Sequence, residues 1–476
     1  MQPKFFNSLS RKVDDFKPIK TGEVSLYTCG PTVYDYMHIG NLRKFVFDDT
    51  LRRTLEASSY KVRHAMNITD VGHLVSDEDD GEDKLEKGAK REGKTVWEVA
   101  EHYIEAFVSD VSALNILPPN AHTGNGNYSR ATDFVSEQIE MVETLIEKGY
   151  AYQTEQAIYF DVTKLPSYGE LTGQSLSDKE VGARPDVVTD KNKHHPQDFG
   201  LWFFTVGRFV NHDMRWDSPW GEGFPGWHLE CSAIIHAVLR DPIDIHTGGV
   251  DNIGTHHVNE MAQTEAAYGH KLANYWMHAE HLLVNEQRMG KSLGNFYTLA
   301  DIKKKGYDPL ALRLLYLQAH YRKQMNFSWE ALDGAQAFLN RLQAWADLQF
   351  QPNLGHRKDA GALYAKATVD IQKALNDDLN TGQALAVLSR LANTAEQEGV
   401  EPKRLTTFLE QIDQLLGLGL SGRKDISDEV KSLIAAREEA RMRGDWENAD
   451  ELRSKLLAQS IEINDTPHGP AWFRGG

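Results

Sequence analysis

The amino-acid sequence predicts an α/β protein that begins with a parallel sheet and continues into a long helical region. A short apolar strand ends at Thr28, and after a turn rich in glycine and proline the apolar side chains recur at helical spacing over residues 42–55. A second strand is predicted over residues 61–68, which completes a strand–helix–strand unit of the kind that builds parallel sheets. Beyond residue 308 the strand pattern gives way to helices.

The bulk composition limits the class of protein. The 476 residues, 41% of them hydrophobic, are enough for three or four domains with cores of their own. No apolar run approaches the ~18 residues of a membrane span, and the N-terminus lacks the apolar core of a secretory signal, so a cytoplasmic location is expected. The 52 basic and 69 acidic residues leave a net charge of −17, which argues against nonspecific coating of nucleic acid but allows RNA on a local basic face.

The other elements follow from apolar periodicity and turn residues. An acidic run over 76–83 is expected to be a solvated loop or helix face, and residues 167–196, rich in Asp, Lys, Gly and His, are interpreted as an exposed insertion. Helices are predicted over 95–114, 129–149, 332–345, 384–391, 427–442 and 445–457, and strands over 150–152, 157–161, 243–246 and 282–284, with a C-terminal hairpin over 461–472.

The turn after the first strand carries a cysteine and leads into a helix start. Cys29 stands at the carboxyl end of the strand, and the helix is predicted to begin at His38-Ile39-Gly40-Asn41. Unpaired N–H groups and the positive end of the dipole at a helix start suit phosphate oxygens, and a glycine there leaves a flat surface for a base. A buried cysteine in an ordinary strand–turn–helix is the alternative that this stretch alone leaves open.

Metal-ligating residue types gather around the second of the chain's two cysteines, Cys231, and at the start of a later helix. His256 and Glu260 stand four residues apart on one helical face, and His257 stands three from Glu260, so either histidine suits. Cys29, Cys231, one of these two histidines and Glu260 together offer two sulfur, one nitrogen and one oxygen ligand, a set that zinc accepts. Two thiols from distant segments of a cytoplasmic chain favour a metal over a disulfide, and solvated histidines are the alternative.

A basic loop with two glycines follows the last predicted strand of this region. Arg288 and Lys291 supply cations, and Ser292 supplies a hydroxyl. Such a loop can close over a polyphosphate, where a cation stabilises the negative charge that grows in the transition state. A basic surface turn is the alternative.

These segments, in their order and spacing, resemble the class I aminoacyl-tRNA synthetases, specifically the cysteinyl-tRNA synthetases, over nearly the whole chain. His38-Ile39-Gly40-Asn41 resembles the family's HIGH signature, and Met289-Gly290-Lys291-Ser292 resembles its KMSKS loop. The resemblance implies a Rossmann-type parallel-sheet catalytic domain with an insertion, a helical bundle and a small C-terminal anticodon-binding domain. The implied parts are a first Rossmann half over 1–120, an insertion over 121–200, a second Rossmann half over 201–270, a stem-contact region over 271–325, a tRNA-binding bundle over 326–420 and the anticodon-binding domain over 421–476.

The resemblance also assigns roles to residues, and it selects His256 over His257 as a metal ligand. The residues expected to hold zinc are Cys29, Cys231, His256 and Glu260. The cysteine pocket is expected to contain Cys29, Thr69 and Trp227. ATP is expected to bind to His38, Gly40, Asn41, Gly248, Gly249, Asp251, Lys291 and Ser292, with His38, Asn41 and Lys291 as catalytic residues.

The implied reaction has two steps and uses one zinc ion per chain and ATP with Mg²⁺. The carboxylate of L-cysteine attacks the α-phosphate of ATP, pyrophosphate leaves, and the cysteinyl group passes to the terminal adenosine of tRNA(Cys). The protein is expected to act as a monomer, and no membrane is expected as a partner. Serine differs from cysteine by one atom, for which shape gives only ~1–3 kcal/mol. A thiolate binds zinc far better than a hydroxyl, so zinc is expected to recognise the substrate sulfur.

Three positions depart from the family pattern. Arg288 and Gly290 replace a lysine and a serine of the loop, which keeps the charge but loses a hydroxyl, and Asn41 replaces a histidine and keeps a donor. In the C-terminal region, stacking and phosphate pairing are the expected means of binding RNA, with a solvated basic face as the alternative. The residues expected to face the anticodon are Arg437, Arg441, Arg443 and Trp472.

Three other functions fit part of the pattern. An amino-sugar cysteine ligase of the same fold resembles the catalytic half, but it lacks the tRNA-binding extension found here over residues 330–476. A zinc hydrolase would use His256, His257 and Glu260, but it needs neither a glycine-containing helix start nor Lys291. An RNA-binding protein without catalysis leaves the nucleotide-site residue types unexplained.

Overall fold

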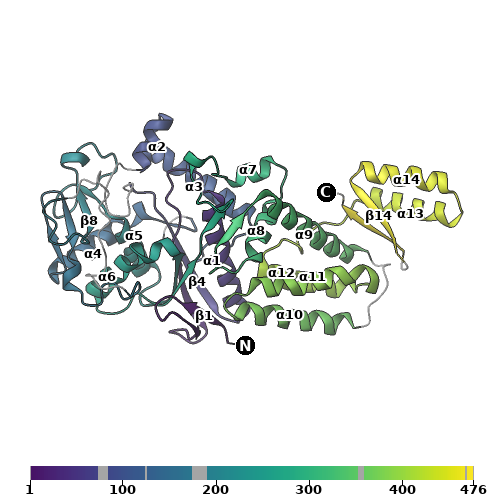
Figure 1. Ribbon diagram of the computed structural model, residues 1–476, viewed down its shortest axis with the longest axis horizontal. Coiled ribbons are helices and arrows are strands. Elements are labelled where there is room, and N and C mark those ends of the chain that lie inside the picture. The colour runs from purple at the N-terminus through teal and green to yellow at the C-terminus, as the bar shows by residue number, and fades with distance from the viewer. Residues whose placement is uncertain are drawn as a thin grey trace. The chain divides into compact units, whose positions relative to one another are not determined.

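The computed structural model describes residues 2–72, 84–123, 126–173, 190–351, 359–466 and 469–474, which belong to two compact units (Figure 1). The N-terminal unit contains residues 2–301 and 321–326, and the C-terminal unit contains residues 302–320 and 327–476. The acidic run predicted over 76–83 lies outside the described residues, as do residues 174–189 of the predicted insertion. The finer domain boundaries stay predictions.

A five-stranded parallel sheet lies in the N-terminal unit, as predicted. Its strand order is β11-β10-β3-β4-β5, and each neighbouring pair is parallel. The chain adds β4 on one side of β3 and later returns with β10 on the other side, so the strand order reverses between β3 and β10. In open α/β sheets, ligands bind in the crevice at such a reversal, beside the carboxyl ends of the strands. The strands are β3 (Glu23–Thr28), β4 (Lys61–Ile68), β5 (Ser129–Arg130), β10 (Ile243–Gly249) and β11 (Ala273–Ala279).

Helix α1 (Ile39–Ala57) begins where the sequence predicts because two side chains satisfy its first free N–H groups. His38 Nδ1 accepts hydrogen bonds from the backbone N–H groups of Gly40 at 3.1 Å and Asn41 at 3.2 Å. In return, Asn41 Oδ1 accepts from the His38 N–H at 3.3 Å. This reciprocal arrangement is a capping box made from histidine and asparagine. It fixes the start of α1 in the stretch that directly follows β3.

Two adjacent helices carry residues of the crevice. Helix α5 (Trp227–Val238) packs on helix α6 (His256–Tyr268), and both contact α4 (Val135–Glu147). α5 also contacts β4, whereas α1 contacts β3, β4 and β10. Apolar side chains of α5, α6 and the parallel sheet form one buried cluster, which includes Tyr27, Ile234, Val258 and Trp276. The helices are therefore fixed to the sheet by the core rather than by loops alone.

A second sheet of the N-terminal unit is antiparallel, in the order β6-β7-β8-β9. Its apolar side chains pack against α4 and α6 and form a second buried cluster with them. Its strands are β6 (Ala151–Gln153), β7 (Ala157–Phe160), β8 (Phe199–Phe204) and β9 (Gly223–Pro225). The other α-helices and strands that begin before residue 309 are β1 (Lys4–Asn7), β2 (Lys12–Asp15), α2 (Lys84–Glu92), α3 (Val96–Ala113), β12 (Leu282–Val284) and α7 (Leu299–Lys304). A later strand, β13 (Met325–Phe327), pairs with β12.

The C-terminal unit is a helical bundle followed by a small α/β domain, which confirms the change to helices predicted beyond residue 308. The bundle helices are α8 (Pro309–Gln318), α9 (Trp329–Asp347), α10 (Ala360–Asn376), α11 (Thr381–Glu398) and α12 (Pro402–Leu416). The small domain contains α13 (Asp428–Met442), α14 (Trp446–Ala458) and the hairpin of β14 (Ile461–Thr466) and β15 (Gly469–Arg474). No helix among the described residues is long and apolar enough to cross a membrane.

A buried carboxylate at the end of α9 ties the bundle to the small domain. Asp347 is fully buried and accepts two hydrogen bonds from Arg423, both at 2.6 Å. Arg474 of the hairpin donates to the same carboxylate at 2.7 Å. Two guanidinium groups thus compensate one buried charge, as buried charges require.

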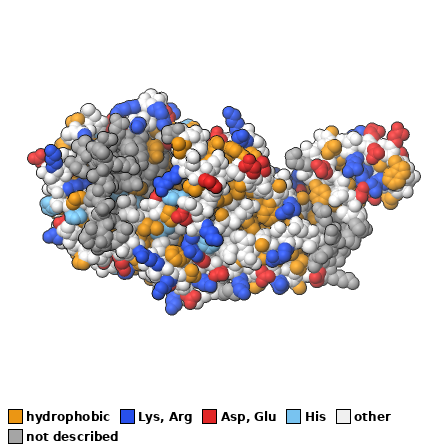
Figure 2. All heavy atoms as spheres, viewed as in Figure 1, with side chains coloured by type: hydrophobic (Ala, Val, Ile, Leu, Met, Phe, Trp, Pro, Cys, Tyr) orange, Lys and Arg blue, Asp and Glu red, His pale blue; other side chains and the backbone are white. Residues whose placement is uncertain are grey.

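Two of the residues expected to face the anticodon are buried, so that part of the prediction is wrong. Arg437 is only 2% exposed because Asp465 of the hairpin binds its guanidinium at 2.9 and 3.0 Å. Trp472 is 5% exposed and packs into the core of the small domain. Arg441, half-buried and paired with Asp465, and the exposed Arg443 remain candidates. Over α13 and α14, Figure 2 shows basic, acidic and hydrophobic side chains interspersed.

Candidate active site and metal centre

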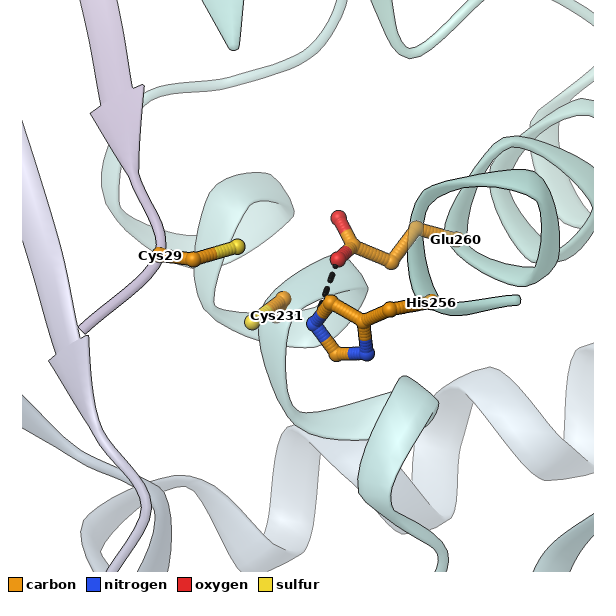
Figure 3. Close-up of side chains that lie close together, drawn as sticks. All are labelled: Cys29, Cys231, His256 and Glu260. Atoms are coloured by element: carbon orange, nitrogen blue, oxygen red, sulfur yellow. Dashed lines mark ion pairs between the residues drawn. The ribbon is translucent and has the colours of Figure 1, made fainter. Parts of the chain in front are cut away.

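Four metal-ligating side chains from three distant segments meet beside the carboxyl end of β3 (Figure 3). Cys29 directly follows β3, Cys231 lies in α5, and His256 and Glu260 lie in α6. One donor atom of each lies within 4.8 Å of the others, and all four side chains are buried. The structure therefore brings together the four residues for which the resemblance implies a zinc site.

Helical periodicity and a neighbouring strand hold the carboxylate of this cluster. His256 and Glu260 are one helical turn apart, and His256 Nε2 lies 2.8 Å from Glu260 Oε1. The other carboxylate oxygen, Oε2, lies 2.6 Å from Nε2 of His246 in β10. On its far side the His256 ring meets His228 of α5, with 2.9 Å between the two Nδ1 atoms. Outer partners of this kind orient the ligands of a metal.

A second set of donors shares two members with the first. Cys29 Sγ lies 3.3 Å from Nε2 of His257, whose Nδ1 lies 2.8 Å from His278 Nε2. The set that converges within 4.8 Å is Cys29, His246, His257 and Glu260. By geometry alone, either His256 or His257 could therefore bind a metal together with Cys29.

Three histidines of this region were missed by the sequence analysis. His246 and His278 lie inside strands β10 and β11, where the pattern of polar and apolar residues gives no sign of a distant partner. His228 stands three residues before Cys231, on the same helical face, and that spacing was the one available signal. All three are buried.

The charges of the cluster depend on one another because the cluster is buried. Burial opposes charge on Glu260, yet His246 and His256 lower the pKa of its carboxyl to about 2. Burial also opposes charge on His256, but Glu260 and Cys29 raise the pKa of its imidazole to about 10. Burial raises the pKa of the Cys29 thiol. The hydrogen bond of Cys29 with Cys231 and the positive charge of His246 outweigh burial, so that the pKa of Cys29 is lowered to about 5. Burial and the adjacent Cys29 raise the pKa of Cys231 instead. This donor set suits a soft divalent cation, which would replace the protons.

The first N–H groups of α1 are engaged within the chain, that of Ile39 by the Tyr297 carbonyl at 2.9 Å and those of Gly40 and Asn41 by His38. Burial lowers the pKa of His38 to about 4, so the ring is neutral at pH 7 and Nδ1 can accept the two capping bonds. Gly40 is covered by side chains: a Cβ there would lie 2.9 Å from the His38 ring and 2.5 Å from the methyl group of Met289. The glycine therefore allows the loop around residue 289 to lie against the helix start.

The carboxyl end of β10, which is the neighbour of β3 in the sheet, carries two of the predicted glycines. A Cβ at Gly248 would lie 2.6 Å from the ring of His257, so the glycine allows the strand to approach that histidine. Gly249 is the N-cap of a short 3₁₀ helix, η4 (Val250–Ile253), that contains Asp251. The Asp251 side chain is exposed at this edge of the sheet.

The basic loop is held by an asparagine and by an aspartate that the sequence analysis did not single out. Asn295 accepts from the Gly290 N–H at 2.8 Å and donates to the Arg288 carbonyl at 3.0 Å. Lys291 forms an ion pair with Asp35 of the turn between β3 and α1. The predicted site residue Ser292 lies in the short 3₁₀ helix η5 (Lys291–Leu293), and its side chain lies outside the described part of the structure.

The remaining predicted pocket residues, Trp227 and Thr69, differ in what they contact. The Trp227 ring stacks on His256, with 4.3 Å between ring centroids. The Thr69 hydroxyl donates to Glu230 Oε2 at 2.6 Å and accepts from Asn67 Nδ2 at 3.2 Å. Burial raises the pKa of Glu230 to about 8. Trp227 thus contacts a member of the cluster directly, whereas the Thr69 hydroxyl is engaged by its own neighbours.

Three family models match this chain. The model described as "tRNA synthetases class I (C) catalytic domain" matches residues 15–337, more than half of the chain. The model described as "DALR domain" matches residues 370–421, and the "Cysteinyl-tRNA ligase anticodon binding domain" matches residues 423–467. The small domain around α13 and α14 is therefore similar to the anticodon-binding domain of this family.

Curated relatives match over the full length. "Cysteine--tRNA ligase 1" of Burkholderia lata is 45% identical over 98% of this chain and 96% of its own length. "Cysteine--tRNA ligase" of Treponema denticola is 40% identical over 99% of both chains.

Solved structures with low sequence identity confirm the fold. A Mycobacterium tuberculosis methionyl-tRNA synthetase in complex with methionyl-adenylate has a TM-score of 0.59 at 14% identity, covering 84% of this chain and 93% of that chain. The ternary complex of Agrobacterium radiobacter K84 agnB2 LeuRS has a TM-score of 0.60 at 12% identity, covering 86% of each chain. By its family models and its full-length relatives, this chain belongs to the cysteine–tRNA ligase family of class I aminoacyl-tRNA synthetases.

Proposed function

We propose that this chain is an ATP-dependent cysteine–tRNA ligase, which activates L-cysteine as cysteinyl-adenylate and transfers it to the 3′ end of tRNA(Cys). The observation that carries this proposal is the meeting of Cys29, Cys231, His256 and Glu260 at the end of β3. A donor set suited to a thiol-binding metal thus stands at the reversal of strand order, where α/β sheets bind nucleotides.

In the first step the cysteine carboxylate attacks the α-phosphate of ATP, and pyrophosphate leaves. The first N–H groups of α1 stay engaged in its cap, so the phosphate oxygens are assigned to the Nε2–H of the neutral His38 ring, the side-chain amide of Asn41 and the positive end of the α1 dipole. The exposed Asp251 suits the ribose hydroxyls. Lys291 supplies a cation where negative charge grows, once it leaves Asp35, and Mg²⁺ bound to ATP would share that charge.

Selection of cysteine is assigned to zinc. The two thiols, one imidazole and one carboxylate that converge here are ligands that zinc accepts, and their burial keeps water from competing. When bound, the ion supplies a soft acceptor for the substrate thiolate, which the hydroxyl of serine does not match. Trp227, stacked on His256, would form a wall of the pocket.

In the second step the cysteinyl group passes to the terminal adenosine of the tRNA. The helical bundle and small domain support this step, because the basic side chains Arg441 and Arg443 of the small domain suit RNA phosphates. We further propose that the protein acts as a monomer in the cytoplasm.

The proposal is tested by ATP–pyrophosphate exchange with the purified chain. Cysteine should stimulate exchange. Its advantage over serine should exceed the ~10–200-fold preference that shape alone allows. Equal stimulation by both amino acids contradicts the thiol-sensing site, and no exchange with any amino acid contradicts the enzyme. Addition of tRNA or of an amino sugar as acceptor then separates a tRNA ligase from an amino-sugar ligase.

A further inference from the structure

Two histidines and a buried aspartate gather where α5 and α6 end. His236 lies in the last turn of α5, His270 directly follows the Gly269 cap of α6, and Asp241 lies in the turn between α5 and β10. The length of α6 separates His270 from His256 of the active-site cluster by about 20 Å. None of the three residues has a role in the proposed reaction.

The carboxylate of Asp241 is the centre of this group. His236 Nδ1 lies 2.5 Å from Asp241 Oδ1, and His270 Nε2 lies 3.7 Å from Asp241 Oδ2. The Asp241 side chain is only 1% exposed, and Oδ2 has no hydrogen-bond partner within the described part of the chain. Buried carboxylate oxygens are normally satisfied by a donor or a cation. The unsatisfied oxygen is the one that faces His270.

An aromatic ring lies against both imidazoles. The Tyr268 ring stacks on His236 with 4.1 Å between centroids and on His270 with 6.0 Å between centroids. Burial raises the pKa of Tyr268 to about 12, and the charges of Asp241 and Glu140 act in the same direction. Two carboxylates therefore act on this ring.

The nearby lysines do not neutralise these carboxylates from close range, because each binds another acceptor. Lys148 Nζ donates to the Ala267 carbonyl at 2.6 Å, and Lys271 Nζ pairs with Glu170 at 3.2 Å. The ends of α5 and α6 also place carbonyl groups here, and the C-terminal end of a helix favours a cation.

We propose that His236, Asp241 and His270 form a second metal site, which takes a divalent first-row transition metal such as Zn²⁺ through two imidazoles and one carboxylate. These are ligands that such ions prefer, and three protein ligands leave room for water. The two histidine side chains are 39% and 36% exposed, so an ion can reach them and the rings can turn toward it. The ion would join the ends of the two helices that carry Cys231, His256 and Glu260.

Metal stoichiometry of the full chain tests this site. After treatment with a chelator, the protein is dialysed against micromolar Zn²⁺, and bound zinc is counted per chain. The native chain should bind two ions, whereas the double variant Asp241→Asn with His270→Gln should bind one. Replacement of the exposed His122, as His122→Gln, provides the matched control and should leave two ions bound.

Cobalt distinguishes this site from the thiolate site of the proposed function. Co²⁺ at Cys29 and Cys231 gives a near-ultraviolet sulfur-to-cobalt band, and Co²⁺ at the second site adds none. The variant Cys231→Ser should lose most of that band and still bind cobalt at the second site. The two proposals therefore fail separately.

A single ion on the native chain, or two ions on the Asp241→Asn, His270→Gln variant, overturns the second site. If the double variant does not fold, His270→Gln alone decides, because this exposed side chain can be replaced without disturbing the core. It should weaken the second ion by at least about tenfold, the lower end of the effect known for residues that only support a ligand. Unchanged affinity in His270→Gln also overturns the site.

Discussion

At the scale of single residues, Gly40 is required because of what surrounds it. A Cβ at this position would come within 2.9 Å of the His38 ring and 2.5 Å of the Met289 methyl group. His38 can withdraw only by giving up the capping bonds of α1, whereas the Met289 methyl group, at the end of a flexible side chain, can turn aside. A methyl group here therefore disturbs the His38 cap in the proposed ATP site.

The variant Gly40→Ala should fold but lose activity. We expect kcat/KM for ATP in pyrophosphate exchange to fall about a hundredfold, the effect of a displacement of about 1 Å in a catalytic group. Gly334→Ala on α9 is the matched control, since nothing lies within 4 Å of its Cβ, and it should raise helix stability by about 0.5–1 kcal/mol without changing exchange. Normal exchange in Gly40→Ala contradicts the assignment of this position to the ATP site.

The pKa of His38 makes part of the stability depend on pH. Its folded pKa of about 4 lies below the unfolded value of about 6.5, so the unfolded chain binds more protons between these values. The contribution is present above pH 6.5 and is lost as the pH falls to 4, by at most about 3 kcal/mol.

In the variant His38→Asn the cap is kept, because asparagine accepts the same bonds, but the titration is removed. Urea unfolding of both proteins at pH 7 and pH 4.5 measures the difference. The variant should lose less free energy of unfolding on acidification than the native chain. Equal losses contradict a buried neutral His38.

At the scale of elements, the basic loop is bound to the turn between β3 and α1. Lys291 pairs with Asp35, which also lies 3.6 Å from Arg91. The ion pair is partly exposed, and such pairs contribute about 0.2–1 kcal/mol. Lys291 must give up this pair before it can reach a phosphate.

Removal of the Asp35 charge should therefore make ATP binding easier. We expect Asp35→Asn to lower the KM for ATP by up to about fivefold at low salt, and less at high salt, because exposed charges are screened. The variant Glu170→Gln, which breaks the similarly exposed pair with Lys271, should leave KM unchanged. An increase in KM shows that Asp35 helps to bind the nucleotide instead.

At the scale of the whole molecule, the residues proposed for the active site lie in the N-terminal unit and the anticodon-binding match lies in the C-terminal unit. Activation of cysteine and charging of tRNA should therefore respond differently to damage in the C-terminal unit. Asp347 offers a specific way to cause such damage, because its buried carboxylate binds Arg423 and Arg474.

The variant Asp347→Asn should destabilise the small domain by about 3 kcal/mol, since it leaves two guanidinium groups without their charge partner. Thermal unfolding, exchange and tRNA charging are measured on the same preparation. We expect charging to fall while exchange is kept. Asp333→Asn, exposed on the same helix, should change stability by less than about 0.5 kcal/mol, because the amide oxygen can still accept the hydrogen bond from Tyr307. Parallel loss of exchange and charging contradicts the independence of the units.

Sequence periodicity was sufficient to predict the elements that pack locally. Strand β4 covers the predicted residues 61–68, and α1 starts at the predicted helix start because its cap is encoded in adjacent residues. Periodicity could not reveal partners that lie far apart. The ion pair of Asp35 with Lys291 joins residues 256 positions apart.

The same limit explains the error in the small domain. Arg437 stands in a basic stretch, but its partner Asp465 lies in the hairpin and removes its charge from the surface. In the candidate active site, spacing in the sequence allowed Glu260 to pair with either His256 or His257. The contact of His246 with Glu260 could not be predicted in this way, because it depends on the position of β10 beside β3 in the sheet.

X-ray absorption at the zinc edge tests the central claim most directly. For the zinc-loaded chain we expect two sulfur ligands at about 2.3 Å and nitrogen and oxygen ligands at about 2.0–2.2 Å. Addition of L-cysteine should bring a third sulfur to the ion, and L-serine should not change the spectrum. A zinc ion without two protein sulfur ligands, or one whose surroundings do not respond to cysteine, would contradict the account.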